Sequence, residues 1–352
     1  MINTYIRDIS EALVQGHAAL MVGAGFSKNA KKITATNKRF LDWKELSDLF
    51  YSSLYGEDGG PGKEYCSSLR LAQEVETISG RPRLDSILKE AAPDLEYAPT
   101  ELYTNLMDLP WTDVFTTNYD TLLERAADTV TSRRYHVVAS QEDLVNSNDV
   151  PRIIKLHGSF PSHRPFIITE EDYRTYPVRF APLVNTVQQS LLENVFCMVG
   201  FSCEDPNFLK WIGWIHDNLG KSSSQKIYMI SVTPILEAKA KLLFEQNIVV
   251  VDLTTIWGDK DVAGRIAAFV EALHTKVANK EAEDIWFSVN KLPQKWQETI
   301  AGRISLLQTL NGTYPGWIVL PWKMKNRVSY VLYELDGMDV LEKASWQEKV
   351  AY

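Results

Sequence analysis

The chain has 352 residues, of which 45% are hydrophobic and 23% charged, an ordinary balance for a folded protein that excludes a disordered or low-complexity chain. Its formal net charge is −8 and its lysines and arginines are scattered, so we expect no direct binding to nucleic acid. The three cysteines, Cys66, Cys197 and Cys203, are too few for a four-thiolate zinc site and form no Cys-x-x-Cys pair, so we expect no metal.

The first element is predicted to be a helix over residues 3–15. The segment MINTYIRDISEAL has amphipathic helical spacing and lacks the basic and apolar regions of a signal peptide. No apolar stretch of the sequence is long enough to span a bilayer. We therefore expect a cytoplasmic protein without a membrane partner.

The rest of the chain is organised around residues 20–27, LMVGAGFS, where an apolar run ends at a Gly-Ala-Gly turn. The run from Ala19 to Val22 does not alternate with polar residues, which predicts a central parallel strand buried on both faces. Gly23 and Gly25 carry no Cβ, so the backbone can bend sharply and a diphosphate can approach its N–H groups. Because the third glycine of G-x-G-x-x-G is missing, the turn alone is equally compatible with a structural role.

The next hundred residues are predicted to be a loop followed by a helical insertion. Residues 28–40 are basic and poor in large aliphatics, so we interpret them as a mobile loop over the glycine turn, able to act as a lid. Helical spacing then predicts a subdomain at about 41–108, inserted between the first two strands of the sheet. Its helices are expected at residues 41–55, 68–78, 83–91 and 100–109. The aromatic residues Trp43, Phe50, Tyr51 and Tyr55 recur at helical spacing, which favours core positions over a ligand platform.

Polar side chains follow the second predicted strand. In WTDVFTTNYDTLLERAA, residues 111–127, Val114 to Thr117 is predicted to be a strand and a helix begins from Asp120. Asn118 and Asp120 therefore lie at the edge of the sheet where ligands bind in open α/β folds. The alternative is that one of them only caps the helix.

A histidine follows the third predicted strand. The segment RIIKLHGSF, residues 152–160, ends in His157 and Gly158, which places an imidazole suited to proton transfer beside a flexible position. A lone histidine here is more often structural. Because the strand ends at Gly23, Asn118 and His157 all carry residues that packing does not require, we interpret them as one site.

Further strands and helices complete the pattern. The segment PFIITEEDYRTYP, residues 165–177, predicts a short strand and the acidic start of a helix. In residues 193–208, a strand over Val195 to Val199, in which Cys197 is a small buried hydrophobe, is followed by Gly200 and Ser202, which suit a ribose or phosphate. Asp205 before Pro206 favours a helix N-cap.

The second half of the chain alternates between helices and strands. Helices are predicted at 207–219 and 235–246, and strands at 226–232 and 247–253, so the expected fold is α/β, a Rossmann-like parallel sheet with helices on both faces. Helices at 262–277, 281–290 and 294–310 follow. Residues 276–352 are expected to be a helical extension. Its large aromatics Trp317, Trp322 and Trp346 lie in a segment with little core of its own, so either the extension docks on the sheet domain or, as we favour, it begins a larger C-terminal region.

Together, GAGFS, TTNYD, LHGS and VGFS resemble, in order and in chemistry, the dinucleotide-binding domain of the sirtuins. The chain is most similar to the sirtuin-like NAD-hydrolysing branch that forms the N-terminal effector domain of bacterial antiphage defence proteins. The likeness covers roughly residues 5–275, so it implies a catalytic domain at 1–275. It implies that Asn118 and His157 are catalytic, and that NAD contacts come from Gly23, Ala24, Gly25, Phe26, Ser27, Thr117, Asp120, Gly200 and Ser202.

The same resemblance implies a function for the chain. The deacylating sirtuins need a four-cysteine zinc module that this sequence cannot supply, which disfavours an NAD-dependent deacylase and leaves an NAD glycohydrolase that releases nicotinamide and ADP-ribose. The resembled effectors also imply a homo-oligomer, with a tetramer plausible, and activation by a phage-derived protein or an associated defence subunit. The alternatives are a module that senses NAD or an ADP-ribose derivative without hydrolysis, and an assembly scaffold.

Overall fold

The computed structural model describes residues 2–56, 62, 66–147, 150–220 and 224–283. The chain divides into one unit over Met1–His274 and a second over Thr275–Tyr352. The predicted helix at 294–310 and the three tryptophans of the extension lie outside the described residues. Of the helix expected at 281–290, only residues 281–283 are described, as the end of a longer helix, α13.

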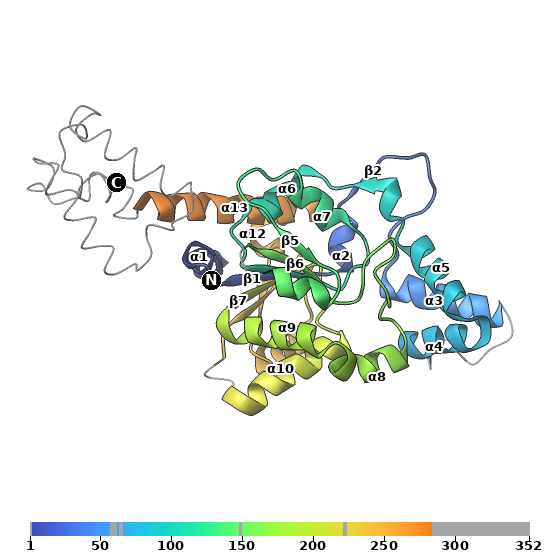
Figure 1. Ribbon diagram of the computed structural model, residues 1–352. Coiled ribbons are helices and arrows are strands. Elements are labelled where there is room, and N and C mark those ends of the chain that lie inside the picture. Colours follow the sequence, from blue (N-terminus) through green and yellow to red (C-terminus); the bar gives the residue numbers. More distant parts are fainter. Residues whose placement is uncertain (1, 57–61, 63–65, 148–149, 221–223, 284–352) are drawn as a thin grey trace, which may run out of the picture. The chain divides into compact units, whose positions relative to one another are not determined.

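The first unit is built on a sheet of seven parallel strands (Figure 1). Its order is β5-β6-β4-β1-β7-β8-β9. The chain goes from β1 to β4 and to the edge strand β5, returns to place β6 between β4 and β5, and then resumes beside β1 with β7 and reaches the other edge. The strands are β1 (Ala18–Val22), β4 (Asp113–Thr116), β5 (His136–Val138), β6 (Arg152–Lys155), β7 (Val195–Val199), β8 (Ile227–Ser231) and β9 (Ile248–Asp252). Every residue of β1 is fully buried, as its unbroken apolar sequence predicts.

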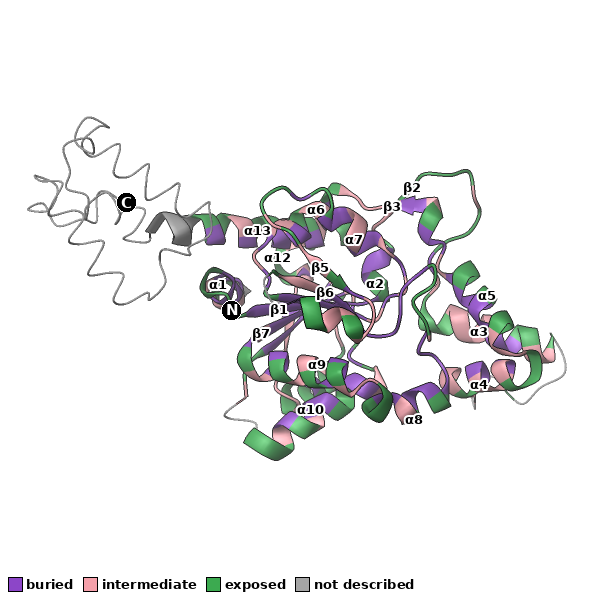
Figure 2. Ribbon diagram, viewed as in Figure 1, coloured by how far each residue is buried: buried purple, intermediate pink, exposed green. Residues whose placement is uncertain are grey.

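Helices cover both faces of this sheet, which confirms the predicted Rossmann-like α/β fold. In Figure 1, α9 and α10 lie on one side of the strands, and α6 and α7 lie on the other. Figure 2 shows that the strands between these layers are buried. Apart from α2 to α5, which are described below, the helices of this unit are α1 (Ile2–Gln15), α6 (Glu101–Asp108), α7 (Leu122–Ala127), α8 (Glu170–Arg179), α9 (Ala181–Glu193), α10 (Pro206–Leu219), α11 (Glu237–Glu245) and α12 (Thr254–Trp257), followed by α13 (Val262–Glu283), which continues into the second unit.

The predicted helical insertion is present between β1 and β4. It contains α3 (Trp43–Tyr55), α4 (Ser68–Ser79) and α5 (Arg81–Ala91), and it has its own apolar core around Phe50 and Leu84. Three residues from the loop that follows β6, Phe160, Phe166 and Ile168, belong to this same core. The insertion is therefore packed onto the loop that carries His157.

The short strand predicted within residues 165–177 is wrong. Phe166, Ile167 and Ile168 are buried, but they are irregular because no strand in the described part of the chain pairs with them. Their backbone is satisfied locally instead: the Ile167 N–H donates to the His157 carbonyl at 3.0 Å, and the Ile168 N–H donates to Asp172 Oδ2 at 3.1 Å. Alternate side chains serve two cores, with Ile167 in the core of the sheet and its neighbours in the core of the insertion. This alternation imitates a strand.

Two small pieces of sheet were not predicted. The edge strand β5 lies in the segment between Asn118 and His157, and the basic segment 28–40 contains β2 (Lys31–Lys32), which pairs antiparallel with β3 (Tyr97–Ala98). Short 3-10 turns lie at Asp94–Glu96 and Glu142–Asn146, and a four-residue helix, α2 (Ala24–Ser27), follows β1. A lid function for residues 28–40 stays a prediction.

The turns after β1 and β7 interlock through their glycines. Gly23 N–H donates to the Val199 carbonyl and Gly25 N–H donates to the Gly200 carbonyl, both at 3.0 Å. A Cβ at Gly23 would lie 2.4 Å from the Gly200 oxygen, and a Cβ at Gly200, whose φ is +65°, would lie 2.3 Å from the Phe26 nitrogen. Glycine is therefore required at positions 23 and 200 because the two backbones approach too closely for a side chain.

This interlock predicts that Gly200→Ala is destabilising. The substitution adds a Cβ in the left-handed region of backbone space and against backbone atoms, so we expect the free energy of unfolding to fall by roughly 2–4 kcal/mol. Urea unfolding followed by circular dichroism measures this change.

Gly213→Ala in α10 is the matched control. An added Cβ there meets no atom within 4 Å, so we expect unchanged or slightly increased stability, by at most about 1 kcal/mol. Equal unfolding midpoints for Gly200→Ala and the unmodified chain would show that the interlock is not needed.

Candidate functional site

Two cavities lie at the carboxyl ends of the central strands. The first, about 80 Å³, is bordered by the loops after β1, β4 and β6 and by the start of α3. The second, about 570 Å³, is bordered by the loops after β1 and β7 and by the same end of α3. Ala24, Asp42, Trp43 and Thr117 line both, so the two cavities meet. This position beside β1 and β7, where the strand order reverses, is where open α/β sheets bind ligands.

Most of the residues predicted from the sequence line these cavities. Those of the first cavity are Ala24, Ser27, Thr117, Asn118, Asp120 and His157. Those of the second are Ala24, Gly25, Thr117, Gly200 and Ser202. The structure therefore brings the four predicted strand ends together.

Gly23 and Phe26 line neither cavity. Gly23 is buried against the turn after β7, and Phe26 is fully buried with its ring 4.5 Å from the ring of Tyr103. The Tyr103 hydroxyl also donates to the Phe26 carbonyl at 3.0 Å. Both residues support the turn from behind.

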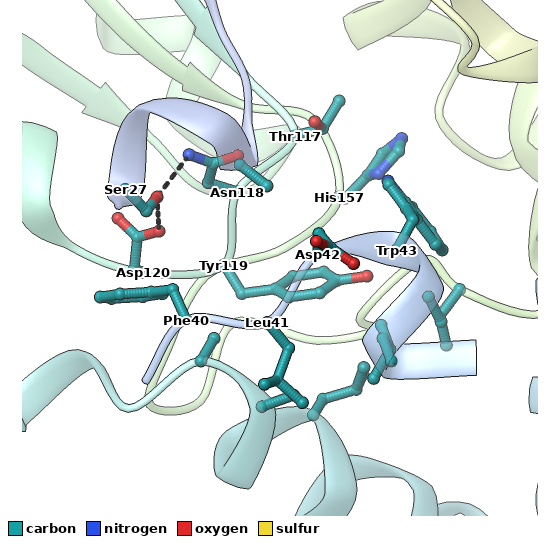
Figure 3. Close-up of a pocket in the computed structure, with 16 residues that line it drawn as sticks. Ser27, Phe40, Leu41, Asp42, Trp43, Thr117, Asn118, Tyr119, Asp120 and His157 are labelled. Atoms are coloured by element: carbon teal, nitrogen blue, oxygen red, sulfur yellow. Dashed lines mark hydrogen bonds between the residues drawn. The ribbon is translucent and has the colours of Figure 1, made fainter. Parts of the chain in front are cut away.

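A short hydrogen-bond chain fixes the amide of Asn118 (Figure 3). The Ser27 hydroxyl donates to Asp120 Oδ2 at 2.8 Å, so its oxygen can accept from Asn118 Nδ2, which lies 3.1 Å away. Asn118 Oδ1 is buried and has no hydrogen-bond partner within the segments that the structure describes. Because the network assigns the nitrogen of the amide to Ser27, the atom left free at Asn118 is an acceptor.

Asp120 anchors this chain and lies two residues before α7 begins. Its Oδ1 accepts from the Leu122 N–H at 3.3 Å, but Thr121 is the N-cap of α7, so Asp120 supports the start of the helix from outside the cap position. Burial raises the pKa of Asp120, and the nearby Lys155 ammonium and the Ser27 hydrogen bond oppose that shift. Lys155 is itself buried and pairs with Glu124 at 2.9 Å. The buried Lys155 ammonium thus lies near Asp120, and Glu124 compensates its charge.

His157 is almost completely buried, with 2% of its surface exposed. Its ring packs in T-shaped contacts with the rings of Tyr173 and Tyr176, at centroid distances of 5.4 and 5.9 Å. Burial lowers the pKa of His157, and the carboxylates of Asp205 and Asp172 oppose that shift. His157 is therefore neutral at neutral pH, and its buried Nε2 has no hydrogen-bond partner in the described part of the chain.

Sequence reasoning missed the contribution of the insertion. Trp43 was expected in the core, but it is 43% exposed and lines both cavities, because it is the first residue of α3 at the end that faces the sheet. The expectation is correct for Phe50 and Tyr51, which are buried. The available signal was Asp42, a capping residue directly before Trp43, which marks the exposed end of a helix.

Asp205 has the capping role expected of it and a second position that was not expected. Its Oδ1 accepts from the N–H groups of Asn207 and Phe208 at 2.9 and 3.0 Å. Its Oδ2 accepts from the Tyr173 hydroxyl at 2.8 Å and lies 3.8 Å from His157 Nε2. No local pattern connects these three residues, because they come from the loops after β6 and β7 and from α8.

No group of three or more histidine, cysteine, aspartate or glutamate side chains among the described residues is arranged to hold a metal ion. In the same part of the chain, no helix combines the length and the apolar character needed to cross a membrane.

The burial of His157 predicts a pH-dependent stability. The unfolded chain binds a proton at this residue near pH 6.5, whereas the folded chain binds it only at lower pH, so stability is lost as the pH falls from 6.5 towards the folded pKa. In His157→Asn this loss disappears. We expect the wild type to lose up to about 1.4 kcal/mol more per pH unit than the variant in this window. Urea unfolding of both proteins at several pH values from 5 to 8 measures the difference, and parallel curves would contradict a buried neutral imidazole.

The comparisons with known proteins agree with this geometry. Residues 112–251, from just before β4 into β9, match the sequence profile of the SIR2-like domain. The chain is 25% identical over 248 residues to Defense-associated sirtuin 2 of Bacillus subtilis, covering 69% of this chain and 23% of that protein. It is 29% identical over 217 residues to the NAD(+) hydrolase ThsA of Enterococcus faecium, covering 60% of this chain and 43% of that protein.

The chain thus spans less than half the length of these relatives. A solved Sir2 homolog–NAD complex aligns with 77% of this chain and 94% of its own, at 13% identity and a TM-score of 0.41. The sequence match and the arrangement of the four strand ends agree: residues 112–251 are similar to the SIR2-like domain, and the chain is similar to proteins named as a defence-associated sirtuin and as an NAD(+) hydrolase.

Proposed function

We propose that this domain hydrolyses NAD to nicotinamide and ADP-ribose and acts as an NAD-depleting effector in bacterial antiphage defence. One observation carries the proposal: two buried polar atoms that have no hydrogen-bond partner among the described residues, Asn118 Oδ1 and His157 Nε2, belong to residues that line the same cavity. Unpaired buried polar atoms are costly, and such costs are concentrated at functional sites. The relatives named as NAD(+) hydrolase and as a defence-associated sirtuin support the substrate and the setting.

The joined cavities suit a dinucleotide. In this proposal the adenosine half occupies the larger cavity beside Gly200 and Ser202, and the diphosphate lies against Ala24 and Gly25 at the start of α2. Ala24 and Gly25 are exposed while their neighbours in the turn are buried, so their backbone is accessible to a ligand. The nicotinamide ribose then reaches the smaller cavity at Asn118.

Hydrolysis requires few groups at that end. As the bond between nicotinamide and ribose C1′ breaks, nicotinamide leaves with the bonding electron pair and positive charge develops on the ribose. Asn118 Oδ1 is a fixed acceptor that can orient the attacking water or a ribose hydroxyl, and neutral His157 can accept the proton that the water loses. A neutral base is an advantage here, because an imidazolium would repel the developing cation.

Other parts of the proposal go beyond the site. We propose that residues 1–275 form the catalytic domain and that the protein is cytoplasmic. We also propose that it assembles as a homo-oligomer, with a tetramer as the expected form, and that a phage-derived protein or a defence subunit activates it. A protein that only senses NAD would use the same cavities. Binding alone gives no reason for Asn118 Oδ1 and His157 Nε2 to stay unpaired among the described residues. Deacylation stays disfavoured because the chain has only three cysteines.

The proposal predicts that Asn118→Ala and His157→Ala each abolish nicotinamide release from NAD, by at least about a hundredfold. Purified proteins are incubated with NAD, and nicotinamide is quantified by chromatography, with cellular NAD measured in expressing bacteria during phage infection as a second readout. His216→Ala in α10 is the control, because His216 lines neither cavity, and it keeps the wild-type rate.

Two outcomes would contradict this proposal in different ways. If the wild type binds NAD in calorimetry but releases no nicotinamide in either assay, the domain is a sensor. If His157→Ala retains the wild-type rate, another group is the base.

Ser27 provides a test of how the amide is held. In Ser27→Ala the Asn118 amide loses the hydroxyl that receives its N–H, so the amide can rotate and its acceptor is no longer fixed. We expect kcat to fall about tenfold with little change in KM, because orientation of the water matters only as the transition state forms. Steady-state kinetics measure both constants, and a change confined to KM would place Ser27 in substrate binding alone.

A further inference from the structure

We propose that Asp205, held in place by Tyr173, is a positioning residue that orients His157 and stabilises the imidazolium formed when His157 takes a proton. The proposal rests on the proposed hydrolase function and deepens it. Its basis is the contact between three side chains from separate segments: the carboxylate at the start of α10, the hydroxyl on α8 and the imidazole after β6.

The carboxylate is fixed by three donors. Asp205 Oδ1 accepts two backbone N–H groups of α10, and Oδ2 accepts the Tyr173 hydroxyl. Burial raises the pKa of Tyr173 well above its ordinary range, so this hydroxyl stays a donor. Asp205 therefore cannot turn away from His157 without breaking several hydrogen bonds.

The remaining face of Oδ2 lies towards His157. The 3.8 Å from His157 Nε2 to Oδ2 is longer than a hydrogen bond and short enough for a strong charge interaction once the ring is protonated. The ring itself is held edge-on by Tyr173 and Tyr176. Neutral His157 thus holds a buried, unpaired Nε2 beside a fixed carboxylate, and the ion formed once the ring takes a proton has a counter-charge nearby.

The step is balanced in atoms and charge. Water forms the C1′–O bond while the C1′–N bond breaks, neutral nicotinamide leaves with the electron pair, and the proton of the water moves to His157. Asp205 stabilises the resulting cation until the proton passes to solvent.

Other charged or titratable groups around His157 do not replace Asp205. Asp172 on α8 is engaged by Arg81 at 3.0 Å and by two backbone N–H groups. Tyr119 donates its hydroxyl to the Ile167 carbonyl, and Tyr176 donates to the Leu156 carbonyl. Asp42, at the start of α3, lines the same cavity and lies 3.3 Å from Lys28.

The decisive variant is Asp205→Asn. Asparagine is a good N-cap and can still contact Tyr173, so the change removes the charge with little change in shape. The ring of His157 is followed by NMR in protein labelled with ¹³C-histidine, and its signal among the six histidines is assigned from its loss in His157→Ala. We expect the titration midpoint of His157 to fall by about one pH unit in Asp205→Asn.

Kinetics provide the second readout. The acidic limb of kcat/KM should move to lower pH by the same amount, and the plateau of kcat should fall at least about tenfold with KM little changed. Asp252→Asn is the matched control, since Asp252 likewise accepts a backbone N–H at the start of a helix, at 2.9 Å from Thr254, and lines neither cavity. We expect it to change neither the midpoint nor the rate.

An unchanged midpoint in Asp205→Asn overturns the proposal, and so does a lower plateau without a shift of the limb, which a purely structural cap would produce. If Asp205→Asn does not fold, Tyr173→Phe is the deciding variant. It keeps the aromatic ring but removes the hydroxyl that holds Asp205 Oδ2, so the titration midpoint of His157 should fall by a smaller amount. An unchanged midpoint in Tyr173→Phe would then overturn the proposal. If the wild type releases no nicotinamide, the proposed function fails, while the NMR titration still tests the pairing of Asp205 with His157.

Discussion

The close approach of two backbone turns determines where every part of the site lies. The turns after β1 and β7 touch through glycines, because any Cβ at Gly23 or Gly200 would overlap the opposite backbone. This contact continues the pairing of the two central strands past their ends. As a result, Ala24 and Gly25 on one turn and Ser202 and Asp205 on the other border a single cavity, which a looser junction would fill with side chains.

The polar groups of the site are then ordered by burial. Ser27, Asn118 and Asp120 are nearly inaccessible to solvent, so each needs hydrogen bonds within the protein. The bonds that they form with one another leave one acceptor, Asn118 Oδ1, without a partner in the described part of the chain. The same holds for His157, whose apolar and aromatic surroundings keep it neutral and leave Nε2 unpaired. The free atoms therefore belong to a rigid arrangement, which is the condition under which an acceptor and a base can act without reorganising.

The sequence was sufficient for those features that depend on local pattern. The unbroken apolar run at β1 and the polar residues after β4 and β6 identify strand ends, and parallel strands bring such ends to one edge. It was insufficient where a role depends on contacts between distant segments. Trp43 has the spacing of a core residue, and only the position of the start of α3 beside the loops after the strands brings it to the cavities. Phe166 and Ile167 have the alternation of a strand, and only the absence of a neighbouring strand makes them a loop.

The helical insertion is coupled through its core to the end of the site that carries His157. Phe160, Phe166 and Ile168, which follow His157 in the chain, pack among the side chains of α3, α4 and α5. Arg81 of α5 adds hydrogen bonds to the Phe166 carbonyl and to Asp172. A movement of the insertion would therefore displace the loop that holds His157 as well as Trp43 at the mouth of both cavities. The insertion is for this reason part of the machinery that positions the imidazole, rather than an appendage beside it.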